Sequence, residues 1–419
     1  MKKLIAVMIC AIFVLGMASY ALADVTISGD ARVRGVTKKN WDFDDDITAG
    51  NTRHWDQRFR INVDTNVDNV KAHMRFTVSE GKWGQNATYG NVSVHDDDLA
   101  YLEVPIGAFT IYAGRQHADW GHKFLVWNAG VDRFKVNYKI SDSAKTGVFT
   151  TKKKENDLVR MDGDLDDYGF YFISSSDAFT GGLLLVHNVQ SVDSTVTDHG
   201  TAKKGEVADF FFTAKTSAAT IAGELAWKNG ALNEETTTVA DFKNGNSQYG
   251  GFLAAFFGNM HAAVAYARDG FVANKYFNPT LFIGKSQLTA MIDFNENIGI
   301  STDGTDTFAA LFGAEFPLAD ATKGGARVAY MIVNPGDLGV ESPDNTLKVK
   351  FLEVDLWAKY KVAETTDWIF EFGYLDPISG LKENKTYNAP GTSFDGNSQM
   401  VKLDDAAMVF VQRLEYKFK

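Results

Sequence analysis

The chain has 419 residues, of which 45% are hydrophobic, and its 42 Lys and Arg against 53 Asp and Glu give a formal charge of −11. An acidic balance argues against a nucleic-acid partner, because nucleic-acid-binding proteins carry basic surfaces. Beyond the N-terminal segment no run of about 18 apolar residues occurs, which excludes a helical membrane span. A membrane location would therefore require a closed β-barrel.

The N-terminal segment has the features of a secretory signal peptide. Met1-Lys2-Lys3 precedes an apolar stretch that ends near Ala18, and Ala21-Leu22-Ala23 is a small-x-small cleavage site. We expect residues 1–23 to be removed, so that the exported chain starts at Asp24. The alternative, a transmembrane anchor, is disfavoured because the apolar run is shorter than about 20 residues. The only cysteine, Cys10, lies in this segment, which excludes disulfides and thiolate metal sites from the exported chain.

Residues 24–419 show segments of about ten residues in which apolar and polar side chains alternate. Residues 25–36, 58–64 and 70–79 are the clearest examples, and residues 352–362 carry Glu353, Asp355, Lys359 and Lys361 opposite an apolar face. A protein core could not bury such a charged face, whereas a water-filled lumen accepts it. The pattern predicts strands with one lipid-facing side and one lumen-facing side.

The connections between these segments alternate in length. Eight short ones fall near residues 65–69, 105–108, 141–145, 174–178, 217–219, 257–259, 318–324 and 363–366, and nine longer polar stretches separate them. Short periplasmic turns and long outer loops are typical of bacterial outer-membrane barrels. The prediction is an all-β, antiparallel transmembrane barrel of about 18 strands. Alternation is poor in residues 145–152, 183–190 and 252–268, and loss of one hairpin there would give 16 strands.

Two stretches resemble known outer-membrane channels. Residues 107–116, Gly-Ala-Phe-Thr-Ile-Tyr-Ala-Gly-Arg-Gln, are similar to the end of the fifth strand in the Gram-negative porin superfamily, and the final segment ending at Phe418 resembles a C-terminal assembly strand. Residues 114–138 also resemble eighteen-stranded channels of the alginate-export type. The resemblance implies that residues 117–131 form a constriction loop. It leaves the substrate open, and the oligomeric state is either a homotrimer or a monomer.

The alternation predicts that basic residues on neighbouring strands face the lumen from one part of the wall. Further charged residues lie in and beside the expected constriction loop. Such a cluster in a narrow pore attracts anions and disfavours cations. The candidate pore-lining residues are Arg32, Arg34, Arg58, Arg60, Lys71, Arg75, Arg115, Asp119 and Arg133, accompanied by His73, His122 and Asp132. The alternative is that the arginines pair with Asp30, Asp56 and Asp64 and serve only to solvate the wall.

The function expected from these features is an outer-membrane porin that forms a water-filled channel for passive diffusion of small hydrophilic solutes and ions, with anions favoured. Lipid and lipopolysaccharide of the outer membrane are the expected surroundings. A substrate-specific channel for a carbohydrate or an organic anion is the alternative, followed by a structural surface barrel. An outer-membrane enzyme is disfavoured, and no cofactor or metal is expected, because no nucleophile elbow or paired metal motif occurs.

Overall fold

The computed structural model describes residues 24–39, 52–84, 98–125, 130–154, 165–190, 203–229, 247–268, 306–334, 349–379 and 406–418. The expected signal peptide lies outside these residues, as does most of each long connection. Among the described residues, no helix is long and apolar enough to cross a membrane. All of the regular structure in the described ranges is β-strand.

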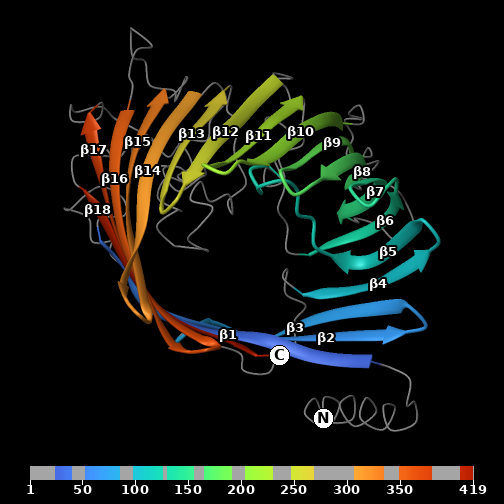
Figure 1. Ribbon diagram of the computed structural model, residues 1–419, viewed down its shortest axis with the longest axis horizontal. Coiled ribbons are helices and arrows are strands. Elements are labelled where there is room, and N and C mark those ends of the chain that lie inside the picture. The colour runs from blue at the N-terminus through green and yellow to red at the C-terminus, as the bar shows by residue number, and fades with distance from the viewer. Residues whose placement is uncertain are drawn as a thin grey trace, which may run out of the picture.

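Eighteen antiparallel strands form one closed sheet. The strands are β1 (Asp24–Lys39), β2 (Thr52–Val67), β3 (Val70–Lys82), β4 (Leu99–Ile106), β5 (Phe109–Gln116), β6 (Val131–Lys139), β7 (Ala144–Lys154), β8 (Leu165–Ser175), β9 (Phe179–Gln190), β10 (Lys203–Lys215), β11 (Thr220–Asn229), β12 (Ser247–Phe257), β13 (Met260–Arg268), β14 (Asp306–Ala319), β15 (Thr322–Asn334), β16 (Val349–Ala363), β17 (Thr366–Ser379) and β18 (Ala407–Phe418). Each strand pairs with its neighbours in the sequence, and β1 also pairs with β18. The strands therefore form the ring seen in Figure 1, and the 16-strand alternative is wrong.

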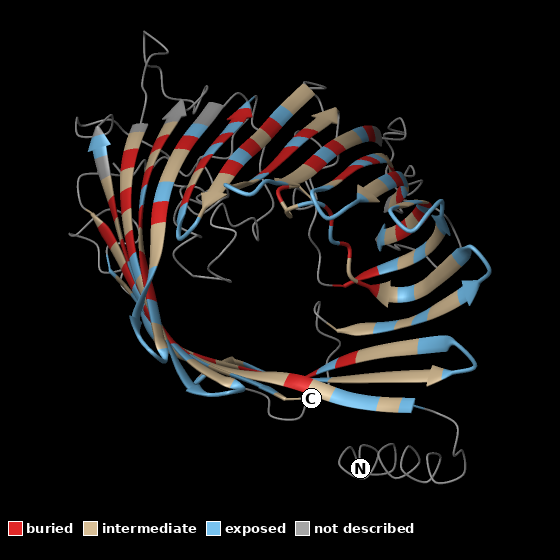
Figure 2. Ribbon diagram, viewed as in Figure 1, coloured by how far each residue is buried: buried red, intermediate tan, exposed pale blue. Residues whose placement is uncertain are grey.

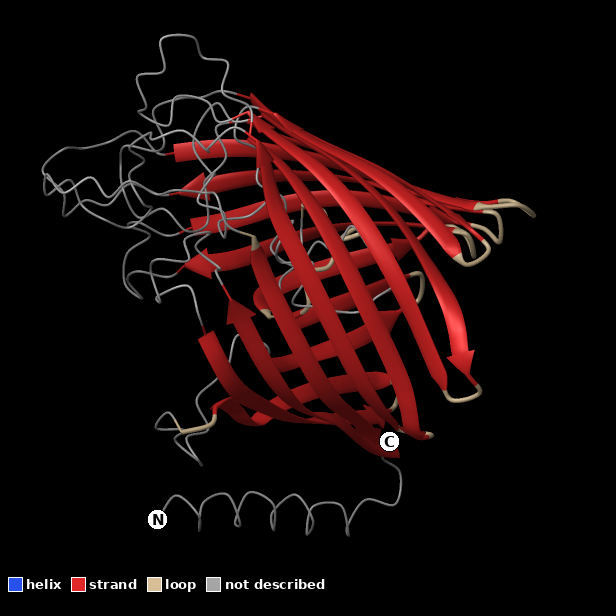
Figure 3. Cartoon of the chain, turned by 90° about the vertical axis from the view of Figure 1, so that its left-hand side faces the viewer, coloured by secondary structure: helices blue, strands red, loops and turns tan. Residues whose placement is uncertain are grey.

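Short turns gather at one end of the barrel, as Figure 3 shows in tan. All eight short connections expected from the sequence are present between paired strands. One of the five two-residue connections joins β2 to β3 through Asp68 and Asn69, whose φ angles are 51° and 69°. Two consecutive positive φ values define the turn that matches the twist of a hairpin, and Asp and Asn tolerate this conformation. We call this the turn end of the barrel, and the opposite end the loop end.

The two faces of the wall differ as the alternation predicted. Large apolar side chains are exposed at alternate positions around the whole ring, among them Leu225, Val78 and Phe312. Residues between them, including Arg58, Asp209 and Glu353, are buried on the inner side, and the resulting banding is visible in Figure 2. An apolar surface of this extent is suited to lipid, and closure leaves no unpaired strand edge within it.

Substitution of an outward residue should test this assignment of faces. Leu225 lies at the middle of β11 and is 62% exposed. We expect Leu225→Arg to lower the free energy of unfolding by about 2–4 kcal/mol, because it places a guanidinium in the apolar band. Urea unfolding of the protein in lipid vesicles, followed by tryptophan fluorescence, measures this loss. Asn62→Arg on the inner face of β2 is the control, and an equal loss there would contradict the assignment.

Candidate pore lining and inward loop

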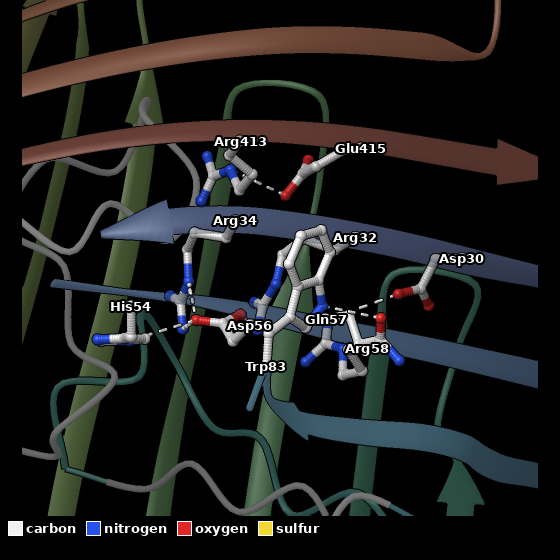
Figure 4. A network of polar contacts seen from close by, with 10 residues as sticks. All are labelled: Asp30, Arg32, Arg34, His54, Asp56, Gln57, Arg58, Trp83, Arg413 and Glu415. Atoms are coloured by element: carbon white, nitrogen blue, oxygen red, sulfur yellow. Dashed lines mark hydrogen bonds and ion pairs between the residues drawn. The ribbon is translucent and has the colours of Figure 1, made fainter. Parts of the chain in front are cut away.

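Four arginines on β1 and β2 share two aspartates on the inner face. Arg34 lies 2.8 Å from a carboxylate oxygen of Asp56, and Arg32 lies 3.5 Å from the other oxygen. Arg60 and Arg58 approach Asp30 at 2.9 and 3.5 Å. Figure 4 shows most of this network from close by.

The pairing leaves this part of the wall positively charged. The register places Arg34 opposite Asp56 and Asp30 opposite Arg60, whereas Arg32 lies directly opposite Arg58. Four guanidinium groups against two carboxylates leave two positive charges in excess. The alternative prediction, that the arginines pair with aspartates, is therefore confirmed for Asp30 and Asp56. This pairing does not neutralise the four arginines.

Barrel closure adds Arg413, which was not among the predicted site residues. Arg413 on β18 stands opposite Arg34 on β1 and interacts with Glu415 at 3.1 Å and with Glu371 at 3.8 Å. Its inward parity could be read from the last segment, but its place beside the β1 arginines depends on the pairing of the first and last strands. The basic group thus covers β18, β1 and β2.

The basic wall continues onto β3 with a different set of partners. Lys71 lies 2.9 Å from Glu103 on β4, and His73 lies 2.7 Å from Asp64 on β2. The Arg75 guanidinium lies 3.0 Å from Nε2 of His117, the first residue after β5. Arg75 therefore joins the wall to the segment that leaves β5.

Two further candidates, Arg133 and Asp119, lie apart from this group. The Arg133 guanidinium donates to the Thr151 hydroxyl at 2.7 Å and lies over the Phe149 ring, 4.1 Å from its centre. Asp119 pairs with Lys123 at 3.5 Å within the segment after β5. The partners of Arg133 and Asp119 lie on β7 and in the segment after β5, so the structure divides the candidates into separate groups.

Arg115 is misplaced in the predicted pore lining. The register pairs Ile111 with Val136, Ala113 with Phe134 and Arg115 with Asp132. Phe134 is among the exposed apolar residues of the outer face, so paired residues two positions away also point outward. The continuous register gives no inversion at this point, and Arg115 and Asp132 form a 3.5 Å ion pair on the lipid side.

Residues 117–125 enter the barrel and pack on the far wall, as the teal segment within the ring of Figure 1 shows. The Trp120 indole donates to Asp209 on β10 at 3.0 Å. The backbone N–H groups of His122 and Leu125 donate to the two carboxylate oxygens of Glu224 on β11. The Glu224 side chain has no exposed surface, so this segment, which we call the inward loop, covers it completely.

Gly121 allows the inward loop to approach Glu224. Its φ of 52° lies in the left-handed region, and a Cβ atom here would lie 2.5 Å from a Glu224 carboxylate oxygen. Both conditions favour glycine, since any side chain would combine strain with a clash. The next residue but one, Lys123, also has a positive φ, of 69°. The loop therefore turns sharply where it meets the wall.

Apolar contacts complete the docking of the inward loop. Trp120 packs in one cluster with Phe149, Tyr171, Leu184 and Phe211. Phe124 packs in a second cluster, whose other members are Ala226, Phe252, Ala254, Ala263, Ala265 and Ala267. These contacts explain why the sequence alternates poorly in β7, β9, β12 and β13: the inner face there is apolar because the loop covers it.

A second charged group lies on β15, β16 and β17. Arg327 interacts with Asp355 at 3.2 Å, and Glu353 and Glu371 are buried on the same inner face. The alternation in the sequence predicts Glu353 and Asp355 to be inward. Arg327, which stands opposite Asp355 in the register, was not predicted. Here carboxylates outnumber guanidinium groups, the reverse of β18 to β2.

These features define a transmembrane barrel with a charged inner wall and one segment folded inside. No protein-family model matches the sequence, and a search of curated proteins finds no relative.

Solved structures do match the fold. Pseudomonas aeruginosa OccK8 (OprE) is 10% identical, with 94% of this chain and 98% of that chain covered and a TM-score of 0.53. Acinetobacter baumannii OccAB1 is 13% identical over 94% and 97%, also with a TM-score of 0.53. The outer membrane protein OprD from P. aeruginosa is 10% identical over 94% of both chains, with a TM-score of 0.52. The chain has the fold of these outer-membrane barrels, and the resemblance expected from the sequence is confirmed at that level.

Removal of the Glu224 carboxylate should release the inward loop. We expect Glu224→Ala to raise the amide hydrogen-exchange rates of His122 and Leu125 at least about tenfold, since two buried donors lose their acceptor and each loss costs roughly 1–3 kcal/mol. Exchange of the refolded protein, read by mass spectrometry of the peptide containing these residues, measures the change. Glu103→Ala, on the inner face of β4, is the control. Unchanged exchange in the Glu224 variant would show that other contacts alone hold the loop.

Proposed function

We propose that this protein is an outer-membrane porin that forms a water-filled channel for passive diffusion of small hydrophilic solutes and ions. The observation that carries the proposal is the combination of a lipid-suited outer face with an inner wall bearing many ionisable groups. A structural barrel has no need of a charged inner wall, whereas a channel needs one to stabilise water and ions. The fold shared with outer-membrane proteins supports this location and a transport role rather than catalysis.

The inward loop is proposed to be the constriction of the channel. It leaves the barrel wall at the loop end of β5 and reaches β10 and β11 across the lumen side of the wall. Docked through Trp120 and Phe124, it occupies part of the cross-section that the ring of strands encloses. A segment held at several points can narrow a pore without closing it. Arg75, through its contact with His117, places a basic side chain at the root of this loop.

The channel is proposed to favour anions. Arg32, Arg34, Arg58 and Arg60 exceed their aspartate partners by two charges, and Arg413 stands beside them with Glu415 and Glu371 as its own partners. A wall with excess positive charge raises the local concentration of anions. The acidic group on β15 to β17 adjoins the basic group, and the two meet where Glu371 lies 3.8 Å from Arg413, so the excess of positive charge is centred on β1 and β2.

Matched substitutions around Asp30 test both the channel and its selectivity. Single-channel recordings in a planar bilayer under a salt gradient should show open steps and an anion-selective reversal potential. Arg58→Ala with Arg60→Ala should shift this potential toward cations, because two positive charges are lost. Asp30→Asn should shift it toward anions, because the partner carboxylate of the same two arginines is neutralised.

The two sets of variants should shift the reversal potential in opposite directions. General damage to the wall would not produce opposite shifts, so this comparison serves as the control. Absence of conductance in every salt would contradict the porin proposal. Identical reversal potentials in the wild type, the double arginine variant and Asp30→Asn would be consistent with a channel. They would contradict the proposal that this part of the wall sets its selectivity.

A substrate-specific channel for organic anions is the second candidate. It is favoured by the arrangement of Arg34 and Arg58 on adjacent strands, because guanidinium groups bind carboxylates in a defined geometry. An organic carboxylate added to the bath would then reduce the chloride current. This block should occur at carboxylate concentrations at which chloride alone does not saturate the conductance. Loss of this block in Arg34→Ala, with chloride conductance retained, would distinguish the specific channel from the general one.

A further inference from the structure

The outward position of Arg115 assigns the arginine of the Gly-Arg-Gln segment to the lipid side of the wall. Arg115 on β5, Asp132 on β6, Lys152 on β7 and Asp166 on β8 stand opposite one another in consecutive strand pairs. The Arg115–Asp132 distance is 3.5 Å and the Lys152–Asp166 distance is 3.1 Å. We call these four residues the outer charged row. It alternates in sign and lies near the loop end of the barrel.

An apolar groove lies directly beneath this row. It has a volume of about 790 Å³, and its outward lining includes Phe134, Val148, Tyr168, Phe170, Leu185 and Ala208. Phe134 and Tyr168 are two residues from Asp132 and Asp166 along their own strands, so the groove begins where the charged row ends. The step from charge to apolar surface matches the boundary between headgroups and acyl chains.

Aromatic residues mark the same boundary. Tyr168 is exposed on the outer face, and Trp227 lines the groove two residues before the loop end of β11. Tyr and Trp are enriched where hydrocarbon meets headgroups, because their rings are apolar and their OH or NH groups require a polar partner. The groove is therefore oriented with its apolar length in the membrane and its mouth at the charged row.

The charge pattern of the row indicates the headgroup it fits. Arg115 and Lys152 present cations that bind phosphate, and Asp132, with 63% of its side chain exposed, lies between them as an acceptor for hydroxyl or amino groups. A simple anion would be attracted by Arg115 and Lys152 but repelled by the carboxylates of Asp132 and Asp166. A headgroup that carries both phosphate and hydrogen-bond donors complements both signs, and its acyl chain can enter the groove.

We propose that the outer charged row and the groove form a binding site for one lipid of the outer leaflet with a phosphorylated, donor-rich headgroup. Arg115 and Lys152 bind the phosphate, Asp132 and Asp166 accept from hydroxyl or amino groups, and an acyl chain lies between Phe134 and Leu185. The inference rests on the proposed outer-membrane location and on the loop end facing outward. It does not depend on conduction by the lumen.

Lipid binding to the refolded full-length protein in detergent tests the site, with native mass spectrometry as the readout. The probes are lipid A, a phosphorylated glucosamine lipid, and its dephosphorylated form. We expect Arg115→Ala with Lys152→Ala to weaken lipid A binding at least about tenfold while leaving the dephosphorylated lipid unaffected, because charge-assisted bonds to phosphate are lost. Ala208→Trp, which fills the groove, should weaken both lipids about equally.

Two matched variants serve as controls. Arg53→Ala removes a cation from β2, and Ala72→Trp adds an indole on the outer face of β3, both away from the groove. Wild-type affinity in every variant, or an equal loss in the controls, would overturn the site and leave only general detergent or annular lipid binding. Single-channel conductance of the same variants should equal that of the wild type. Binding without any conductance would refute the porin proposal but not the lipid site.

Discussion

Closure of the backbone hydrogen-bond ladder is the constraint on which the rest of the structure depends. Hydrocarbon offers no partner for an exposed N–H or carbonyl group, so a β-sheet in lipid must have no edge. The pairing of β1 with β18 meets this requirement. Closure also fixes an inside and an outside for every strand, and a shift of one residue would exchange the two faces. The same pairing brings Arg413 next to the arginines of β1.

The inward loop shows how a local exception to alternation arises. Most of the wall contrasts an apolar outer face with a polar inner face, but Leu184 on β9 and Phe252 on β12 are inward and apolar because Trp120 and Phe124 pack on them. In contrast, Asp209 and Glu224 are inward, polar and almost fully buried, because the loop supplies their hydrogen-bond donors. Wall and loop therefore depend on each other for the satisfaction of buried groups.

Charged side chains are distributed unevenly between the inner and outer faces of the wall, and also between groups of strands. On the inside, shared carboxylates reduce the excess charge of the basic group without removing it, and an acid-rich group stands on other strands. On the outside, charge is confined to places such as the row of Arg115 and Lys152 near the loop end. Similar residues thus have different surroundings, and their side of the wall decides whether they meet water or lipid.

The sequence by itself predicted a barrel of about 18 strands, the eight short turns and the inward parity of Arg32, Arg58 and Arg75, because period-two alternation is a local property. The choice between 18 and 16 strands needed the structure. The sequence did not determine the partners of these residues or the outward position of Arg115, since the alternation near Gly114 is weak and the register of neighbouring strands is needed to fix it. Arg327 and Glu224 were missed because their partners, Asp355 and the inward loop, lie far away in the chain. Only the tertiary structure decided these contacts, because they form across strand pairs and across the lumen rather than along the sequence.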